Sequence, residues 1–136
     1  EQRGIQVVES KRRETEDYQS LVSITVSDGT DDLTVSGTLF GDNEPRLVEI
    51  DGFRVDATPY GHMVVSRNRD EPGVIGALGG VFGEHDVNIA GMANARESID
   101  GEAMSVYNLD DPVTPELLEE LESDSRVTGV TAIDLD

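Results

Sequence analysis

The sequence predicts an α+β protein in which an antiparallel, β-rich segment precedes a compact βαββαβ unit. Between residues 4 and 57, apolar residues alternate with polar ones or form short β-branched runs, without helical spacing. After residue 61, two amphipathic helical patterns lie between strand patterns. We therefore expect two domains, residues 1–60 and residues 61–136.

The first domain is expected to be a run of strands without a helix. Asp51-Gly52 is a strong two-residue hairpin signal, and residues 11–20 and 29–32 read as connectors. In one strand, Leu33, Val35, Gly37 and Leu39 should share an apolar face. The expected strands are residues 4–10, 21–28, 33–40, 46–51 and 53–57.

The second domain is organised around a helix expected at residues 72–85. Asp70 should accept from the free N–H groups at its start, Pro72 suits its first turn, and Gly73 allows close approach to the backbone. Four more glycines weaken the helix by roughly 1 kcal/mol each, which suggests that another backbone packs against it. Its expected buried face is Val74, Ile75, Leu78, Val81 and Phe82, and the four glycines are Gly76, Gly79, Gly80 and Gly83.

The remaining elements complete a ferredoxin-like βαββαβ order. A second helix should begin at Thr114-Pro115-Glu116, with Thr114 as its N-cap and with Leu117, Leu118 and Leu121 buried. A turn is expected at residues 98–101. The expected strands are residues 62–68, 87–97, 102–110 and 127–135.

Composition argues against several classes of partner. The net charge is −19, with 29 acidic residues against 10 basic ones, so nucleic acid and anionic membranes should be repelled. The spread of acidic residues and the single lysine, Lys11, are typical of a protein adapted to high salt. There is no membrane-span or signal-peptide pattern, so a cytoplasmic location is expected. Because the sequence starts at Glu1 without a methionine, we expect it to be part of a longer protein.

No catalytic or metal site is expected. The chain has no cysteine, and no GxGxxG motif follows a strand. His62 and His85 have no identifiable catalytic partner. The acids Asp28, Asp31 and Asp32 lack the spacing and terminal glutamate of a calcium loop.

Residues 68–96 resemble a known protein family. NRDEPGVIGALGGVFGEHDVNIAGMANAR resembles the first half of an ACT domain, a small regulatory module that binds amino acids. The segments RGIQVVES, SGTLFG and EPRLVEIDGFRVD occur before it in the order seen in the C-terminal region of the D-3-phosphoglycerate dehydrogenase family. The resemblance implies a partial intervening (allosteric-substrate-binding) domain at 1–60 and an ACT domain at 61–136. It also implies that the NAD-binding and catalytic domains lie outside this chain, which should hold no cofactor itself.

The resemblance also implies an effector site for L-serine or another small amino acid. Asn68, Asp70 and Asn88 match positions that hold the ligand in serine-binding ACT domains, and Gly73, Val74 and Ile89 flank them. Asp70 suits an ammonium, the helix N-terminus suits a carboxylate, and the asparagines suit a hydroxyl. The site is expected at a seam between copies of the chain, in a homodimer or a higher homo-oligomer. In the first domain, Arg46 and Arg54 are a possible anion site, although a surface salt bridge is an equal alternative.

Two other assignments remain open. The matching tail of an iron–sulfur L-serine dehydratase β chain carries similar segments. A dimerisation module without a ligand is the third reading.

Overall fold

The computed structural model describes residues 6–12, 21–27, 32–40, 44–95 and 98–135. It divides into two compact units, residues 1–58 and residues 59–136, which are described separately. None of the described helices is long and apolar enough to cross a membrane. The connector expected at 13–20 and the turn expected at 29–31 lie outside the described residues.

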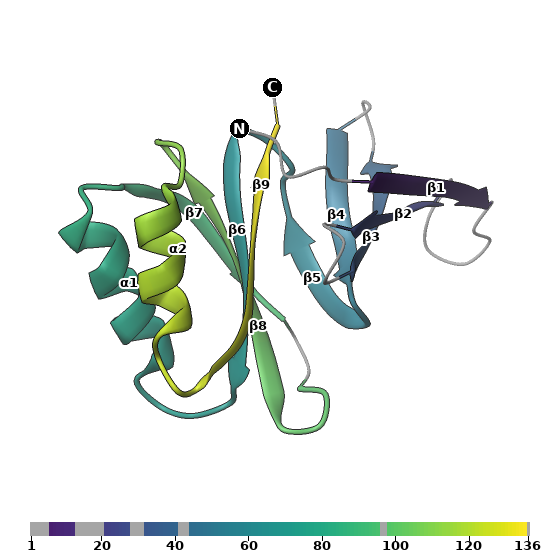
Figure 1. Ribbon diagram of the computed structural model, residues 1–136. Coiled ribbons are helices and arrows are strands. Elements are labelled where there is room, and N and C mark those ends of the chain that lie inside the picture. The colour runs from purple at the N-terminus through teal and green to yellow at the C-terminus, as the bar shows by residue number, and fades with distance from the viewer. Residues whose placement is uncertain (1–5, 13–20, 28–31, 41–43, 96–97, 136) are drawn as a thin grey trace. The chain divides into compact units, whose positions relative to one another are not determined.

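The first unit is a five-stranded antiparallel meander (Figure 1). Each strand pairs antiparallel with the next one in the sequence. Asp51 and Gly52 join the last two strands with φ angles of 49° and 86°, the left-handed pair that the Asp-Gly signal predicts. The strands are β1 (Gln6–Arg12), β2 (Leu21–Ser27), β3 (Asp32–Phe40), β4 (Glu44–Ile50) and β5 (Phe53–Ala57).

Two details of this unit correct the sequence analysis. Strand β1 continues through Lys11 and Arg12, which were assigned to the connector, because both pair with β2. In β3, Leu39 is 46% exposed whereas Ser36 and Thr38 are buried, so the expected apolar face does not continue to the strand end. The change coincides with a bulge in β4, where the register shifts opposite Ser36. Ser36 Oγ lies 2.8 Å from Ser23 Oγ, which provides the buried hydroxyl with a partner.

The second unit is a four-stranded antiparallel sheet in the order β7-β8-β6-β9, with both helices on one face (Figure 1). This confirms the predicted ferredoxin-like order. The elements are β6 (His62–Arg69), α1 (Val74–Glu84), β7 (Ile89–Asn94), β8 (Glu102–Leu109), α2 (Pro115–Glu122) and β9 (Val127–Asp134).

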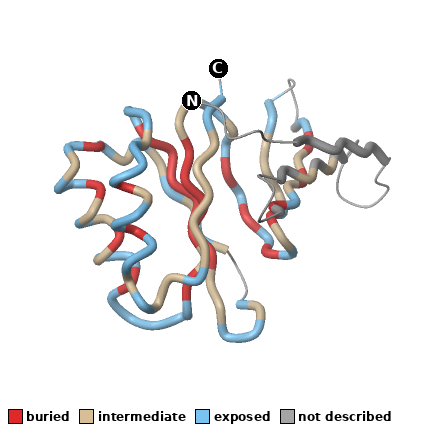
Figure 2. Tube along the Cα trace, in the orientation of Figure 1, coloured by how far each residue is buried: buried red, intermediate tan, exposed pale blue. Residues whose placement is uncertain are grey.

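The core of the second unit lies between the sheet and the helices. Buried residues follow the central strands and the sheet-facing sides of both helices (Figure 2). Phe82 and Tyr107 are in tilted aromatic contact, with ring centroids 5.0 Å apart. As predicted, Leu117 and Leu121 are buried. The Oγ1 atom of Thr114 caps α2 by accepting from Leu117 N at 3.1 Å.

The first helix differs from its prediction at its start. It begins at Val74, its N-cap is Gly73 with a φ of 90°, and no side chain caps it. Asp70 therefore does not act as the cap, and Pro72 precedes the helix. Glycine adopts the left-handed conformation of this N-cap without strain. This conformation explains Gly73 better than the close approach of another group to the backbone does. Ile75, expected in the core, is 43% exposed.

The outward glycines of α1 do not contact another backbone within this chain. A Cβ atom placed on Gly76, Gly79, Gly80 or Gly83 would meet no atom within 4 Å among the described residues. The close packing expected from these glycines is therefore absent inside the unit. The cost to helix stability has no compensation within one copy of the chain.

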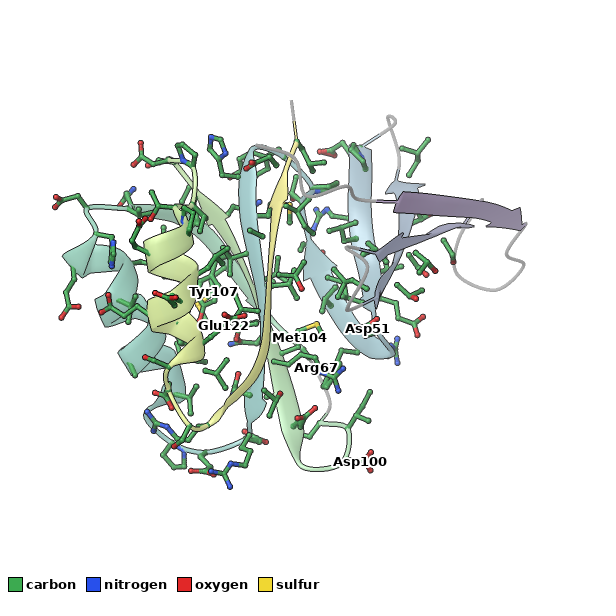
Figure 3. The ribbon with its side chains drawn as sticks, in the orientation of Figure 1. Asp51, Arg67, Asp100, Met104, Tyr107 and Glu122 are labelled. Carbon is green, nitrogen blue, oxygen red and sulfur yellow. The ribbon has the colours of Figure 1, made fainter. Side chains whose placement is uncertain are left out.

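Turn chemistry fixes the hairpin tips of both units. Asp51 belongs to the β4–β5 turn, and Asp100 belongs to the turn before β8 (Figure 3). Asp100 and Gly101 have φ angles of 55° and 77°, as a two-residue hairpin turn requires. The turn predicted at 98–101 is therefore confirmed, and it places Ser98 next to the end of β6.

Candidate functional site

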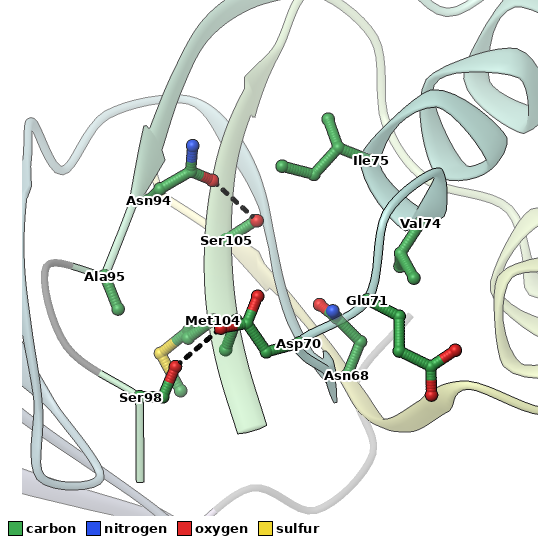
Figure 4. A pocket seen from close by; sticks show the side chains of 11 residues that line it. Asn68, Asp70, Glu71, Val74, Ile75, Asn94, Ala95, Ser98, Met104 and Ser105 are labelled. Atoms are coloured by element: carbon green, nitrogen blue, oxygen red, sulfur yellow. Dashed lines mark hydrogen bonds between the residues drawn. The ribbon is translucent and has the colours of Figure 1, made fainter. Parts of the chain in front are cut away.

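A cavity of about 240 Å³ lies in the second unit, where β6 ends and α1 begins (Figure 4). The ends of β7 and β8 form its other walls, so four elements meet around it. Its volume lies just below the usual range for small-molecule sites, about 300–1,000 Å³. The lining residues are Asn68, Asp70, Glu71, Val74, Ile75, Asn94, Ala95, Ser98, Ala103, Met104 and Ser105.

Asp70 is fixed at the cavity by its backbone and its side chain. Its amide donates to Gly101 O at 3.0 Å, and the preceding amide of Arg69 donates to Arg126 O at 2.8 Å. Its carboxylate accepts from Ser98 Oγ at 2.8 Å (Figure 4). A hydroxyl donor leaves the negative charge of Asp70 in place, so the carboxylate remains able to bind a cation.

Asn68 contributes a buried acceptor. Its side chain is 4% exposed, and its Nδ2 atom donates to Arg69 O at 2.7 Å. This bond fixes the orientation of the amide, because the opposite orientation would place two oxygen atoms together. Oδ1 is buried and has no hydrogen-bond partner among the described residues. An unpaired buried acceptor is costly, so a bound donor would be favourable here.

The other walls are neutral or acidic. Ser105 Oγ donates to Asn94 Oδ1 at 2.8 Å, and Val74 and Ile75 form an apolar side. Glu71 adds a second carboxylate, which lies 3.3 Å from Arg69 in an exposed ion pair. No lysine or arginine is among the lining residues that the structure describes.

The turn before α1 is supported from the second helix–strand loop. Arg126 Nη1 lies 3.4 Å from Pro72 O, and its other guanidinium nitrogens donate to Asp124. Hydrogen bonds from Arg126 lower the pKa of Asp124 to about 2. Gly73 does not line the cavity, but its backbone places the first free N–H groups of α1 next to it.

A group of hydroxyls lies behind the cavity wall. Tyr107 Oη and Ser66 Oγ are buried without a completed hydrogen bond among the described residues. Burial raises the pKa of Tyr107, and the nearby hydroxyls of Ser105 and Ser66 act in the opposite direction. These groups are close enough to interact, but their geometry does not complete a bond.

Asn88 and Ile89 lie at the other end of the sheet. Ile89 pairs with Leu109, which pairs with His62 at the start of β6, whereas Asn68 is near its end. Six residue steps along β6 separate His62 from Asn68 by about 20 Å. The side chain of Asn88 donates to Asp110 at 2.8 Å, and Ile89 packs against the core. One copy of the chain therefore does not bring Asn88 to Asp70.

The two arginines of the first unit are placed on one hairpin. Arg46 forms an ion pair with Asp56, and Arg54 is exposed and pairs in register with Glu49. Each cation thus has an acid nearby.

The histidines have structural contacts. His62 lies 2.8 Å from Asp134, and His85 lies 2.8 Å from Glu120. The bond from His85 lowers the pKa of Glu120. Among the described residues, no group of three or more histidine, aspartate or glutamate side chains is arranged to hold a metal ion.

Sequence reasoning missed four polar lining residues. Glu71 follows Asp70 directly, and Ser98 belongs to a turn that was predicted without a role. Asn94 and Ser105 face each other only because of the β7–β8 register. A correct prediction of the β7–β8 register would have placed Asn94 opposite Ser105.

Comparison with known proteins identifies both units. Residues 1–51 match the D-3-phosphoglycerate dehydrogenase intervening domain, and residues 62–126 match the ACT domain. The chain is 38% identical to D-3-phosphoglycerate dehydrogenase of Archaeoglobus fulgidus, over 98% of this chain and 26% of that protein. It is 33% identical to the Bacillus subtilis protein of the same name, over 98% of this chain and 26% of the relative. A probable L-serine dehydratase β chain of B. subtilis is 23% identical over 85% of this chain and 53% of its own length. The chain thus spans about a quarter of the dehydrogenases that it matches.

Proposed function

Because this chain joins an intervening-domain segment of the D-3-phosphoglycerate dehydrogenase family to an ACT domain, we propose that it senses L-serine for such an enzyme. Serine would act as a feedback inhibitor of serine biosynthesis. The inhibited NAD-dependent oxidoreductase domains would lie elsewhere in the same polypeptide. The chain itself would supply no catalytic group and no cofactor contact.

The observation that carries this proposal is the cavity beside Asp70 and Asn68. Among the described residues, a carboxylate without a basic partner and a buried amide oxygen without a hydrogen bond line one small space. Serine offers an ammonium to Asp70 and a hydroxyl to Asn68, and its carboxylate can reach the free N–H groups at the start of α1. A small zwitterion therefore matches the groups available.

A two-fold seam along β7 would complete the site. Strand β7 is an edge of the sheet, and its sequence IAGMAN carries no charge. If two copies pair antiparallel about a two-fold axis between Gly91 and Met92, Asn88 of one copy lies beside Ala95 of the other. Ala95 lines the cavity with Asp70. The separation within one chain would thus become proximity across the seam.

The charge distribution also favours association of two copies through β7 and the exposed side of α1. Helix α1 carries a single charged residue, Glu84, whereas α2 carries four glutamates. In a chain of net charge −19, the uncharged face of α1 is where a second copy meets the least repulsion. Ile75 and Met92 are exposed and would be buried there.

Such an assembly would make effector binding and dimer formation one linked equilibrium. Serine held by both copies would tighten the dimer, and dilution would weaken serine binding. An allosteric coupling of about 1–3 kcal/mol would suffice to regulate the catalytic domains.

Mixing two defective variants tests the shared site. Asp70→Ala removes the ammonium partner, which is worth roughly 1.5–3 kcal/mol, and Asn88→Ala removes the partner's contribution. Each variant alone should lose serine binding by calorimetry. After mixing and exchange in equal amounts, half of the dimers are mixed and each has one intact site, so about a quarter of the sites should bind again.

No recovery on mixing, together with full serine binding by Asn88→Ala alone, would place the site within one chain. Unchanged serine binding by Asp70→Ala would reject the cavity itself. The ratio of dimer to monomer, measured by sedimentation with and without serine, checks the linkage independently.

The dehydratase alternative rests on the 23% match to the L-serine dehydratase β chain. That match has lower identity and covers less of this chain than the matches to the dehydrogenases. The sequence that surrounds this chain in its gene distinguishes the two, because only the dehydrogenase would carry a nicotinamide-binding domain.

A further inference from the structure

We propose that the cavity recognises its ligand through the ammonium group and not through the carboxylate, so that it accepts protonated amino alcohols as well as amino acids. This inference rests on the proposed function, because it assigns the ligand chemistry of the same cavity.

The cavity offers mainly hydrogen-bond acceptors. Asp70, Glu71 and the Oδ1 atom of Asn68 are all acceptors at neutral pH. The hydroxyls of Ser98 and Ser105 are already donating, to Asp70 and to Asn94 respectively. Among the described lining residues, only the Nδ2 atom of Asn94 is a side-chain donor without a recorded bond.

The buried acceptor is independent of the acidic pair. Asn68 is more than nine-tenths buried, and its Nδ2 atom is held by the carbonyl oxygen of Arg69 at 2.7 Å. Because that bond fixes the amide, a ligand meets the oxygen and must bring a hydrogen to it. A hydroxyl or a second hydrogen of the ammonium group satisfies this requirement, and a carboxylate does not.

The charges around the cavity favour the same choice. Among the described residues, Asp70 has no basic partner, and Arg69 lies beside Glu71 in an exposed pair. The described lining residues therefore carry two negative charges and no positive one. The net charge of −19 adds an attraction for cations that falls as salt screens it.

A ligand carboxylate has only weak support in comparison. Its partners would be the free N–H groups at Val74 and Ile75, because no basic side chain is among the described lining residues. A charge-assisted bond between an ammonium and Asp70 changes affinity by roughly tenfold to 150-fold. Loss of the ammonium should therefore weaken binding more than loss of the carboxylate does.

Calorimetry with three matched ligands tests the inference on the complete 136-residue chain. L-Serine is the reference, serinol replaces its carboxylate with a hydroxymethyl group, and L-glycerate replaces its ammonium with a hydroxyl. We expect serinol to bind within about tenfold of L-serine, and L-glycerate to bind at least about tenfold more weakly than either. Repeating the titrations at 0.1 M and 1 M KCl separates the cavity from the long-range field, because only the latter is screened.

A serinol affinity more than about tenfold below that of L-serine, or L-glycerate binding as tightly as L-serine, would overturn the inference and leave serine sensing intact. Absence of binding by L-serine itself would overturn the proposed function instead. The variant Asp70→Asn keeps the shape and removes the charge, and it should weaken serinol at least about tenfold. Glu119→Gln, an equal charge change on the exposed face of α2, is the control and should leave all three affinities unchanged.

Discussion

Replacement of Gly79 by alanine separates the stability of one chain from the stability of the dimer. Within the chain, a Cβ atom at Gly79 meets nothing within 4 Å, and the residue has ordinary helical geometry. Alanine should therefore stabilise α1 by about 1 kcal/mol, which corresponds to a rise of about 4–8 °C in the melting temperature of a unit of this size. If α1 faces a second copy, however, two new methyl groups enter the seam.

The expected cost at the seam follows from symmetry. Gly79 lies one turn after Ile75, on the side of α1 that lines the cavity. Overpacking of a close helix contact costs about 1–3 kcal/mol, so the dimer dissociation constant should rise by roughly 5- to 150-fold. Gly80→Ala is the matched control, because Gly80 is about 100° further round the helix and also has open space.

Two measurements are needed on each variant. Thermal unfolding of dilute, monomeric protein should show stabilisation by both substitutions. Sedimentation over a concentration series should show weaker association for Gly79→Ala only. An unchanged dimer constant in Gly79→Ala would remove α1 from the seam, and our account of its glycines would be wrong.

Three further outcomes are expected. Thr114→Ala should destabilise the second unit by about 1 kcal/mol in urea unfolding, because it removes the N-cap bond to Leu117. The melting temperature should rise between 0.1 M and 2 M KCl, since the screening length shrinks from ~10 Å at 0.1 M to ~3 Å at 1 M; a flat or falling temperature would contradict salt adaptation. Asp124 has a folded pKa of about 2, below its ordinary value of 3.8, so its contribution is present above about pH 4 and is lost towards pH 2. The stability deficit of Asp124→Asn should therefore shrink over that pH range, and a deficit that stays constant would argue against the pair with Arg126.

The order of elements was predictable because each signal is local. Asp51-Gly52 and Thr114-Pro115 specify a turn and a helix start through their own backbone preferences, and both hold in the structure. The prediction for the start of α1 was wrong because the carboxylate of Asp70 accepts from Ser98, which belongs to a distant turn. A contact across 28 residues of sequence carries no local periodicity.

Tertiary context also decided which apolar residues are buried. Ile75 fits the helical stripe, but it lies at the margin of the cavity and stays exposed. Leu39 follows the period of its strand, but the bulge in β4 alters the sheet beside it. Periodicity identifies a face, whereas the neighbours of that face determine its burial.

The geometry around Asp70 constrains how an effector signal can leave the cavity. The turn is tied to the start of β9 by the bond from Arg69 to Arg126, and to the 98–101 turn by the bond from Asp70 to Gly101. Each backbone bond contributes about 0.5–1.5 kcal/mol net, so breaking both would consume about as much free energy as a typical coupling of 1–3 kcal/mol provides. We therefore expect Asp70, the 98–101 turn and the start of β9 to move as one block when a ligand binds. Because β7 is an edge strand whose end also lines the cavity, the response that costs least is a change in how two copies associate along that edge.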